Sequence, residues 1–358
     1  MLKRIDRYII AKFLGTYFLS IALIISIAVV FDTTEKLDNF FANNVPLEKI
    51  IFDYYANFIP YFATLFSPLF VFIAVIFFTS KMAENTEIVA ILASGVSFRR
   101  MMLPYFISAL IIASITFYLN SYMVPKGNIV RLEFENKYIR NRTSETVFHV
   151  QMEVKPGVIM YLERYDKNRR RGFGFSLEQF EDKRLVSRMT ANNVEWDTLY
   201  NWKVHNYLIR HFEGLAERIE KGMSRDTIIP IQPVDFIVTR GMQEQMTLSE
   251  LSSYLSRQRA RGVGNITEFE LEYHKRFAFP FAAFILTLIG VSLSSQKKRG
   301  GMGINIGTGL ILSFSYIMLS TVSSTFAING NMSPILAVWI TNIIYLPIGI
   351  FLYIRAPK

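Results

Sequence analysis

Six long apolar runs, divided by one polar block, constrain this 358-residue chain more than any other feature. An α-helix needs roughly 18–25 residues to cross a hydrocarbon layer of about 30 Å, and each run has such a length. The polar block lies between Tyr122 and Phe277 and is too hydrophilic to enter a bilayer. The sequence therefore predicts six transmembrane helices, at Phe13–Phe31, Phe58–Thr79, Met101–Tyr122, Phe277–Ser294, Ile304–Ile328 and Pro334–Ile354.

The composition and the motifs exclude several classes of protein. Cysteine is absent, so the chain has no disulfide framework and no thiolate nucleophile or metal ligand. The net charge of +10 could suit nucleic acid, but basic residues of a membrane protein commonly face the cytoplasm and anionic lipid, so no nucleic-acid partner is expected. The four histidines are scattered and no phosphate-binding G-x-x-x-x-G-K-[ST] loop occurs. We expect no metal, no cofactor and no catalytic site, and therefore not an enzyme.

Basic residues in the short loops predict the orientation. A cytoplasmic N-terminus leaves only Lys36 and Lys49 in the short outer loops, as the positive-inside rule requires. Both termini are then cytoplasmic, and the polar block lies outside. Apolar spacing over residues 2–13 predicts a short helix on the membrane surface before the first span. The basic residues on the cytoplasmic side are Lys3, Arg4, Arg7, Lys12, Lys81, Arg99, Arg100, Lys297, Lys298, Arg299, Arg355 and Lys358.

The central block indicates antiparallel β structure. Its apolar and polar residues partly alternate in short segments that turn clusters separate, which favours a sandwich or jellyroll. Val158, Met160 and Leu162 fall on one face, where they either fill a core or line a groove for lipid tails. We predict a membrane α+β fold, six helices (3+3) with a β-jellyroll-like domain inserted between helices 3 and 4. The expected domains are 1–123, 124–245 and 246–358, and the expected strands are 147–154, 157–165, 174–181, 184–196 and 202–212.

A short amphipathic segment at residues 84–95 follows the second apolar run. Glu84 and Glu87 begin it, an apolar edge runs along it, and Gly95 can end it with a left-handed cap. Such a helix, parallel to the membrane, could dock a cytoplasmic motor, or it could be an interfacial loop helix without a partner. The apolar edge consists of Ile88, Ile91 and Leu92.

Charged residues also gather at the outer edges of the spans. Lys36 follows the first run, Arg131 the third, and Lys275 and Arg276 precede the fourth. Such side chains commonly extend to the membrane surface without further function. If they converge on a cavity, they suit the phosphates of an anionic lipid.

Several short segments follow one another in a specific order along the chain. They are LKRIDRYII at the start, TEIVAILASGVS at 86–97, VPKG at 124–127, MYLERY at 160–165 and HKRFAFPFAAF at 274–284. Together with the six apolar runs and the outer β block, this order resembles the LptF/LptG family of lipopolysaccharide export permeases over essentially the whole chain.

The resemblance implies a half-permease in the bacterial inner membrane that pairs with a second LptF/LptG-type half. It implies a dimeric cytoplasmic ATPase of the LptB type, periplasmic bridge proteins of the LptC/LptA type, and lipopolysaccharide as the transported lipid. By position, Glu87 matches the acidic residue of the family's ATPase-coupling helix, and Ser94 with Gly95 match its small pair. Basic residues after the first span bind lipid phosphates in some members, and here only Lys36 is available.

Two other functions stay open from the residues alone. A different ABC-type membrane subunit, mechanotransmitting or efflux, would share the motor partner and hold no lipid. A membrane enzyme acting on lipid would need a catalytic set that the sequence does not offer.

Overall fold

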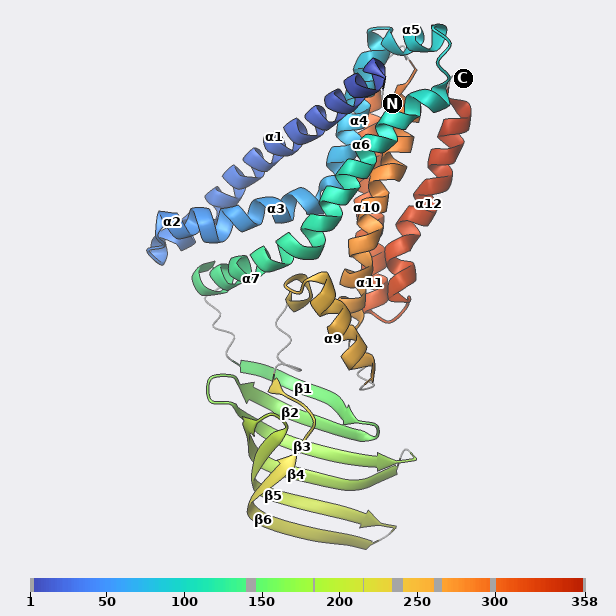
Figure 1. Ribbon diagram of the computed structural model, residues 1–358. Coiled ribbons are helices and arrows are strands. Elements are labelled where there is room, and N and C mark those ends of the chain that lie inside the picture. The colour runs from blue at the N-terminus through green and yellow to red at the C-terminus, as the bar shows by residue number, and fades with distance from the viewer. Residues whose placement is uncertain are drawn as a thin grey trace. The chain divides into compact units, whose positions relative to one another are not determined.

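The computed structural model describes residues 3–139, 146–182, 184–214, 216–233, 241–260, 266–296 and 301–356. The chain divides into two compact units. The membrane unit comprises Met1–Ile139, Gln243–Ser249 and Thr267–Lys358, and the sheet unit comprises Arg140–Met242 and Glu250–Ile266. Figure 1 shows the helices of the first unit and the strands of the second.

Six helices in the described part of the chain are long and apolar enough to cross a membrane, which confirms the six predicted spans. Several extend beyond the apolar runs, because charged residues continue the helix past the expected membrane edge. These helical segments are Arg4–Ala42 (α1), Ser67–Glu84 (α4), Phe98–Ile139 (α6 and its continuation), Thr267–Ser294 (α10), Gly303–Ile328 (in α11, which begins at Gly301) and Pro334–Arg355 (α12).

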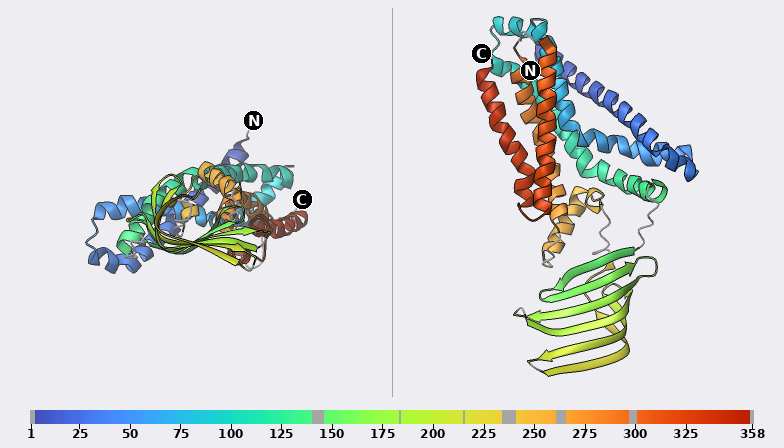
Figure 2. Two further views of the ribbon diagram at one scale, coloured as in Figure 1. Left: turned by 90° about the horizontal axis from the view of Figure 1, so that it is seen from below. Right: turned by 180° about the vertical axis from the view of Figure 1, so that it is seen from behind.

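Helix α1 is a single helix of 39 residues. The prediction of a separate surface helix before the first span is therefore wrong, since the N-terminal turns continue directly into the apolar run. At 1.5 Å per residue the helix is about 58 Å long, well beyond the roughly 30 Å of a hydrocarbon layer. Figures 1 and 2 show it diverging from α4 and α6 along its length. Only 17% of its most apolar window is buried, compared with 78% for α4.

The second and third spans bend at prolines. Helix α3 (Ala56–Leu65) ends at Phe66, and Pro68 lies in the first turn of α4, so the predicted span Phe58–Thr79 is two helices. Helix α6 (Phe98–Tyr118) passes through a π-helix, η2 (Leu119–Met123), into α7 (Val124–Phe134), which has Pro125 in its first turn. Proline removes a backbone donor and π-turns disturb the helical ladder, so both joints allow the outer segments to leave the bundle axis.

The segments beyond these joints pack together as an outer arm. It contains the outer end of α1, α2 (Leu47–Lys49), the π-helix η1 (Ile50–Tyr55), α3, α7 and η3 (Glu135–Ile139). Its core is a cluster of aromatic rings, namely Phe40, Tyr54, Phe58 and Phe134. The β domain was expected to begin at residue 124, but residues 124–139 are helical, and the first strand among the described residues begins at Thr146.

The remaining helices form the main apolar core of the membrane unit. Small residues allow close helix approach, and a Cβ at Gly309 of α11 would lie 2.2 Å from Ile76 Cδ1 of α4. Ser313 and Ser324 of α11 are also buried. Asn342 of α12 bonds to two neighbouring helices: its amide nitrogen donates to the Ala278 carbonyl (3.0 Å), and its amide oxygen accepts from the Tyr316 hydroxyl (2.8 Å).

In the described part of the chain, six antiparallel strands form one sheet in chain order. The five predicted strands are present, and a sixth, β6, was missed because its sequence AERIEKGMSRDTI is mostly polar. The described strands follow one another as a curved meander (Figure 2), and jellyroll connectivity is not confirmed. The strands are β1 (Thr146–Lys155), β2 (Val158–Asp166), β3 (Arg171–Glu181), β4 (Arg184–Thr198), β5 (Asn201–Glu213) and β6 (Ala216–Ile228).

One face of the sheet carries an apolar core. Trp202 is fully buried there, and its indole nitrogen donates to the Ile231 carbonyl (3.0 Å), so the segment after β6 folds back onto this face. Ile229 and Ile231 are buried in the same cluster. A short 3₁₀ turn, η4 (Met242–Glu244), and α9 (Leu248–Ala260) lie between the sheet and α10 in the chain.

Candidate functional site

The predicted loop helix is α5 (Glu87–Ala93). Glu84 does not belong to α5, because it is the last residue of α4. Gly95 follows with φ +84°, the left-handed conformation that the sequence predicted for its cap. The Ser94 hydroxyl donates to the Ile91 carbonyl (2.7 Å), which satisfies one of the last carbonyls of this short helix.

The apolar edge of α5 faces the core of the membrane unit, and a role of α5 in docking a motor stays a prediction. Ile88 is 1% exposed, and Ile91 and Leu92 pack partly buried against the same core. The exposed face is the opposite one, where Val89 is 62% exposed and Ala90 is also exposed. The edge that the sequence singled out therefore anchors α5, and a small aliphatic face remains available to a partner.

The first turns of α1 are attached on both sides of α5. The Tyr8 hydroxyl donates to Glu87 Oε2 (3.1 Å), and Asn85 donates to the other carboxylate oxygen (3.2 Å). Asp6, which is 3% exposed, accepts two bonds from the Arg100 guanidinium, at 2.8 and 2.6 Å. Such a bidentate pair fixes orientation as well as distance. Sequence reasoning missed Asp6, although it is a lone acid within the basic segment KRIDR.

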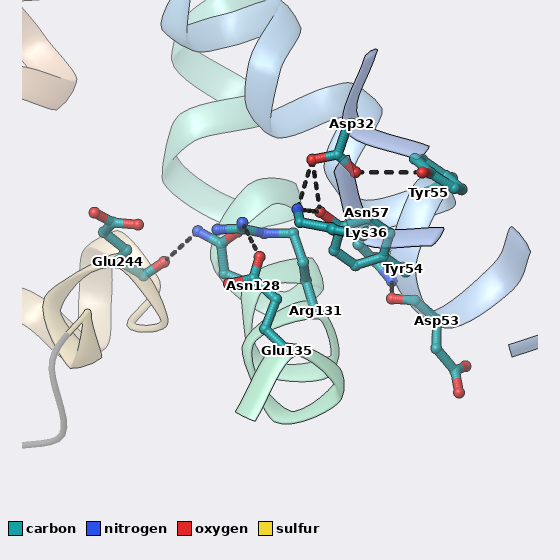
Figure 3. Close-up of polar contacts among 10 residues, drawn as sticks. All are labelled: Asp32, Lys36, Asp53, Tyr54, Tyr55, Asn57, Asn128, Arg131, Glu135 and Glu244. Carbon is teal, nitrogen blue, oxygen red and sulfur yellow. Dashed lines mark hydrogen bonds and ion pairs between the residues drawn. The ribbon is translucent and has the colours of Figure 1, made fainter. Parts of the chain in front are cut away.

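Lys36 lies in a polar cluster inside the outer arm (Figure 3). Its ammonium pairs with Asp32 at 2.5 Å, bonds to the Tyr54 hydroxyl, and lies 4.7 Å from the centre of the Tyr54 ring. Tyr55 donates to the other Asp32 oxygen (3.2 Å). Burial, together with the Asp32 charge, raises the pKa of the Tyr54 phenol well above its ordinary range, so it stays a donor. Lys36 is thus neutralised within the arm.

Arg131 of α7 is similarly paired. Its guanidinium donates to Glu135 (2.8 Å) and to the Asn128 amide oxygen (3.1 Å), and it stacks over the Tyr61 ring at 4.3 Å. The Asn128 amide in turn donates to the Glu244 carbonyl (3.2 Å), as Figure 3 shows. Arg131 is 6% exposed, so its charge is compensated where it lies.

A cavity of about 130 Å³ lies where α3 and α7 meet α10. Arg276 is 1% exposed on its wall and donates to Glu272 (3.1 Å) and to the Gln243 carbonyl (3.3 Å). Its Nη1 nitrogen is buried without a hydrogen-bond partner among the described residues. Burial and the nearby Glu272 raise the pKa of the Glu244 carboxyl in the same cavity above its usual value. Lys275 also lines the cavity, half-buried.

The structure therefore separates the four predicted phosphate-binding cations into two groups. Lys36 and Arg131 lie in the aromatic arm with carboxylates four residues away on their own helices. Lys275 and Arg276 share one cavity, where part of the guanidinium remains available. Glu135 is the partner of Arg131 and Glu272 is the partner of Arg276, and the spacing of four residues is the one sequence signal that could have predicted these pairs.

The predicted lipid-groove residues on β2 have unequal environments. Met160 and Leu162 are fully buried in the sheet core, so these two side chains fill the core and do not line a groove. Val158 lines a hollow of about 510 Å³ together with Leu177, Met189 and Ile209. Polar residues from β5 and β6 complete its wall, namely His211, Glu220, Arg225, Asp226 and Thr227. Only Val158 of the three thus faces an open space.

Comparison with known proteins gives one strong match. A family model described as "Lipopolysaccharide export system permease LptF/LptG" matches residues 7–355, nearly the whole chain. The matched range includes the six apolar helices, α5 and the sheet. No curated protein matches the chain.

Proposed function

The chain belongs to the LptF/LptG family of lipopolysaccharide export permeases, and from this premise we propose that it extracts lipopolysaccharide from the outer leaflet of the inner membrane. As a member of that family it is a non-catalytic transporter component and a multi-pass inner-membrane protein. The match over residues 7–355 is the observation that carries the proposal. The proposal adds a second half-permease, a dimeric cytoplasmic ATPase as the source of energy, and periplasmic bridge proteins as the acceptor.

The loop charges support the orientation in this proposal. Both termini and α5 lie in the cytoplasm, and the sheet unit lies in the periplasm, because this arrangement places most basic loop residues inside. The inner end and the middle of α1 then differ in how much of their surface is covered by the rest of the chain. Its inner end is attached to α5 and α6, while its middle leaves apolar side chains such as Leu23 (59% exposed) and Ile27 (56% exposed) for lipid or another subunit.

Helix α5 is the contact with the ATPase in this proposal. Glu87 and the exposed face at Val89 and Ala90 suit a groove on the partner, because small side chains allow close approach of backbones. Ile88 holds the helix to the membrane unit, so a push on α5 reaches the transmembrane core directly.

The sheet unit supplies an apolar surface for the acyl chains during transfer. Each exposed methylene costs roughly 0.8 kcal/mol in water, so lipid tails need a covered route. In this proposal the route is lined by the apolar side chains of Val158, Leu177, Met189 and Ile209. Met160 and Leu162 stabilise the sheet beneath it rather than touch the lipid.

The lipid phosphates bind in this proposal at the cavity of Lys275 and Arg276. The free Nη1 of Arg276 can donate to a phosphate oxygen, and Lys275 adds a second cation. Arg276 also pairs with a carboxylate, but Lys36 and Arg131 are less available, because neither has a buried nitrogen without a partner among the described residues.

The test is purification of the tagged full chain from native membranes in mild detergent, with mass spectrometry of the bound proteins and lipids. We expect a second permease half, a nucleotide-binding subunit and lipopolysaccharide. Recovery of the nucleotide-binding subunit without lipopolysaccharide favours a different ABC-type complex. A photocrosslinker at Val158 that labels lipopolysaccharide, next to one at Met160 that does not, supports the route over the sheet.

A further inference from the structure

The inner end of α1 is joined to α5 by a contact that the transport cycle could use. The Tyr8 hydroxyl donates to Glu87 Oε2 over 3.1 Å, although the two residues are 79 positions apart. The bond is charge-assisted, and the Tyr8 ring also lies edge-on to Phe78 of α4, with ring centres 6.3 Å apart. Glu87 keeps its other oxygen bonded to Asn85. One carboxylate therefore bridges α5 and α1.

A second attachment fixes the same part of α1 to the helix that follows α5. Asp6 and Arg100 form a bidentate pair, with Asp6 almost fully buried. Asp6 and Tyr8 are two residues apart and therefore point to different sides of α1. Two residues therefore hold the first two turns of α1. Glu87 lies at the start of α5, and Arg100 lies beyond its end.

The length and the low burial of α1 beyond its first turns allow its outer end to follow a movement of its inner end. Ile9, Phe13 and Tyr17 pack its inner part into the main core, whereas only 17% of its most apolar window is buried, so few contacts of that stretch resist a change of tilt. The helix is about 58 Å long, and a tilt of about 5° at the inner end displaces the outer end by about 5 Å. At that outer end Asp32 and Lys36 bond to the tyrosines of η1. A small movement of α5 can therefore reach the outer arm through α1.

We propose that Tyr8 is a positioning residue that transmits movement of α5 to α1, with the Asp6–Arg100 pair as the pivot. This inference rests on the proposed function, since it takes ATP-driven movement of α5 as its input. When α5 shifts, the Tyr8–Glu87 bond draws the N-terminal turns of α1 with it. The pivot converts that shift into a tilt, and the outer end of α1 moves relative to α12.

The absence of cysteine allows a direct test with two introduced labels. Spin labels at Leu37→Cys, near the outer end of α1, and at Ile335→Cys, in the first turn of α12, occupy exposed positions of the membrane unit. Their distance is measured in the full complex in nanodiscs, without nucleotide and after trapping with ADP and vanadate. Tyr8→Phe removes only the hydroxyl and keeps the ring beside Phe78.

We expect a nucleotide-dependent distance change in the wild-type chain and less than half of that change in Tyr8→Phe. Tyr8→Lys restores a donor of similar reach and should restore the change. Tyr118→Phe is the matched control, because Tyr118 is an exposed tyrosine (61%) of the same unit, and the change likewise removes only a hydroxyl and keeps the ring beside Tyr122. ATP hydrolysis by each complex is followed in parallel, and we expect it to stay within twofold of wild type for both Phe variants.

The outcomes separate the inference from the function on which it rests. An unchanged distance shift in Tyr8→Phe, with ATP hydrolysis intact, overturns the role of Tyr8 and leaves the permease function in place. A wild-type complex that hydrolyses ATP without any shift also overturns it, because α1 then does not follow α5. Failure to bind any ATPase overturns both proposals.

Discussion

Val89 and Ile88 are adjacent in α5 and have opposite environments, so they test which face of the helix meets the ATPase. Val89 is 62% exposed and Ile88 is 1% exposed. Val89→Ala removes two carbons, worth roughly 1.6 kcal/mol when fully buried, and 62% of that value is roughly 1 kcal/mol. If docking covers Val89, the ATPase should bind about fivefold more weakly to the variant.

Ile88→Ala is the matched comparison. It removes three carbons from the core of the membrane unit, and large-to-small core changes cost about 2–5 kcal/mol. We expect its thermal midpoint to fall by at least about 4 °C, whereas that of Val89→Ala stays unchanged. The assays are titration of the ATPase onto nanodiscs that hold both permease halves, and thermal unfolding of each variant. Wild-type affinity in Val89→Ala, together with weakened binding in Ile91→Ala, would refute the orientation of α5 described above.

Three further predictions concern stability and lipid binding. Asn342→Leu leaves the Tyr316 hydroxyl and the Ala278 carbonyl without their partner, so it should destabilise the membrane unit by about 1–3 kcal/mol, measured by thermal unfolding in detergent. The pKa of Glu244 is raised in the folded state, so its contribution to stability is present below its ordinary pKa and is lost as the pH rises through the raised value. Glu244→Gln should remove that loss, and the thermal midpoint between pH 4.5 and pH 8 should then depend less on pH. Lys275→Gln removes a half-buried cation from the cavity and should reduce co-purified lipopolysaccharide about three- to tenfold at an unchanged thermal midpoint.

The sequence predicted the elements whose side chains follow a strong period. Six apolar runs gave the six membrane helices, and alternation gave β1 to β5. Strand β6 could not be found this way, because Met223 (86% exposed), Ile219 (51% exposed) and its charged neighbours do not alternate between a core and a solvent face. It is a strand because β5 supplies hydrogen-bond partners along its length, which no local pattern reports.

The direction of the helix faces was harder to predict than the helices themselves. The edge Ile88, Ile91 and Leu92 was correctly identified as apolar, but an apolar edge can meet a partner or the protein's own core, and periodicity does not distinguish these. The extent of the β domain was misjudged for a related reason. Residues 124–139 contain charges that disfavour a membrane core, yet four-residue pairs such as Arg131–Glu135 stabilise a helix there.

The charge pairing of the outer cations limits how tightly any anion can bind to them. Lys36, Arg131 and Arg276 each hold a carboxylate four residues away. A hydrogen bond to a charged group contributes about 1.5–3 kcal/mol, so three unpaired cations would add about 5–9 kcal/mol, or more than a thousandfold in affinity. An arriving phosphate instead exchanges places with a carboxylate, and the net gain is the small difference between two similar bonds. A permease must release its lipid in every cycle. Weak exchange at most cations, with one incompletely paired group at Nη1 of Arg276, holds a lipid phosphate only briefly. Movement of the helices can then displace the lipid.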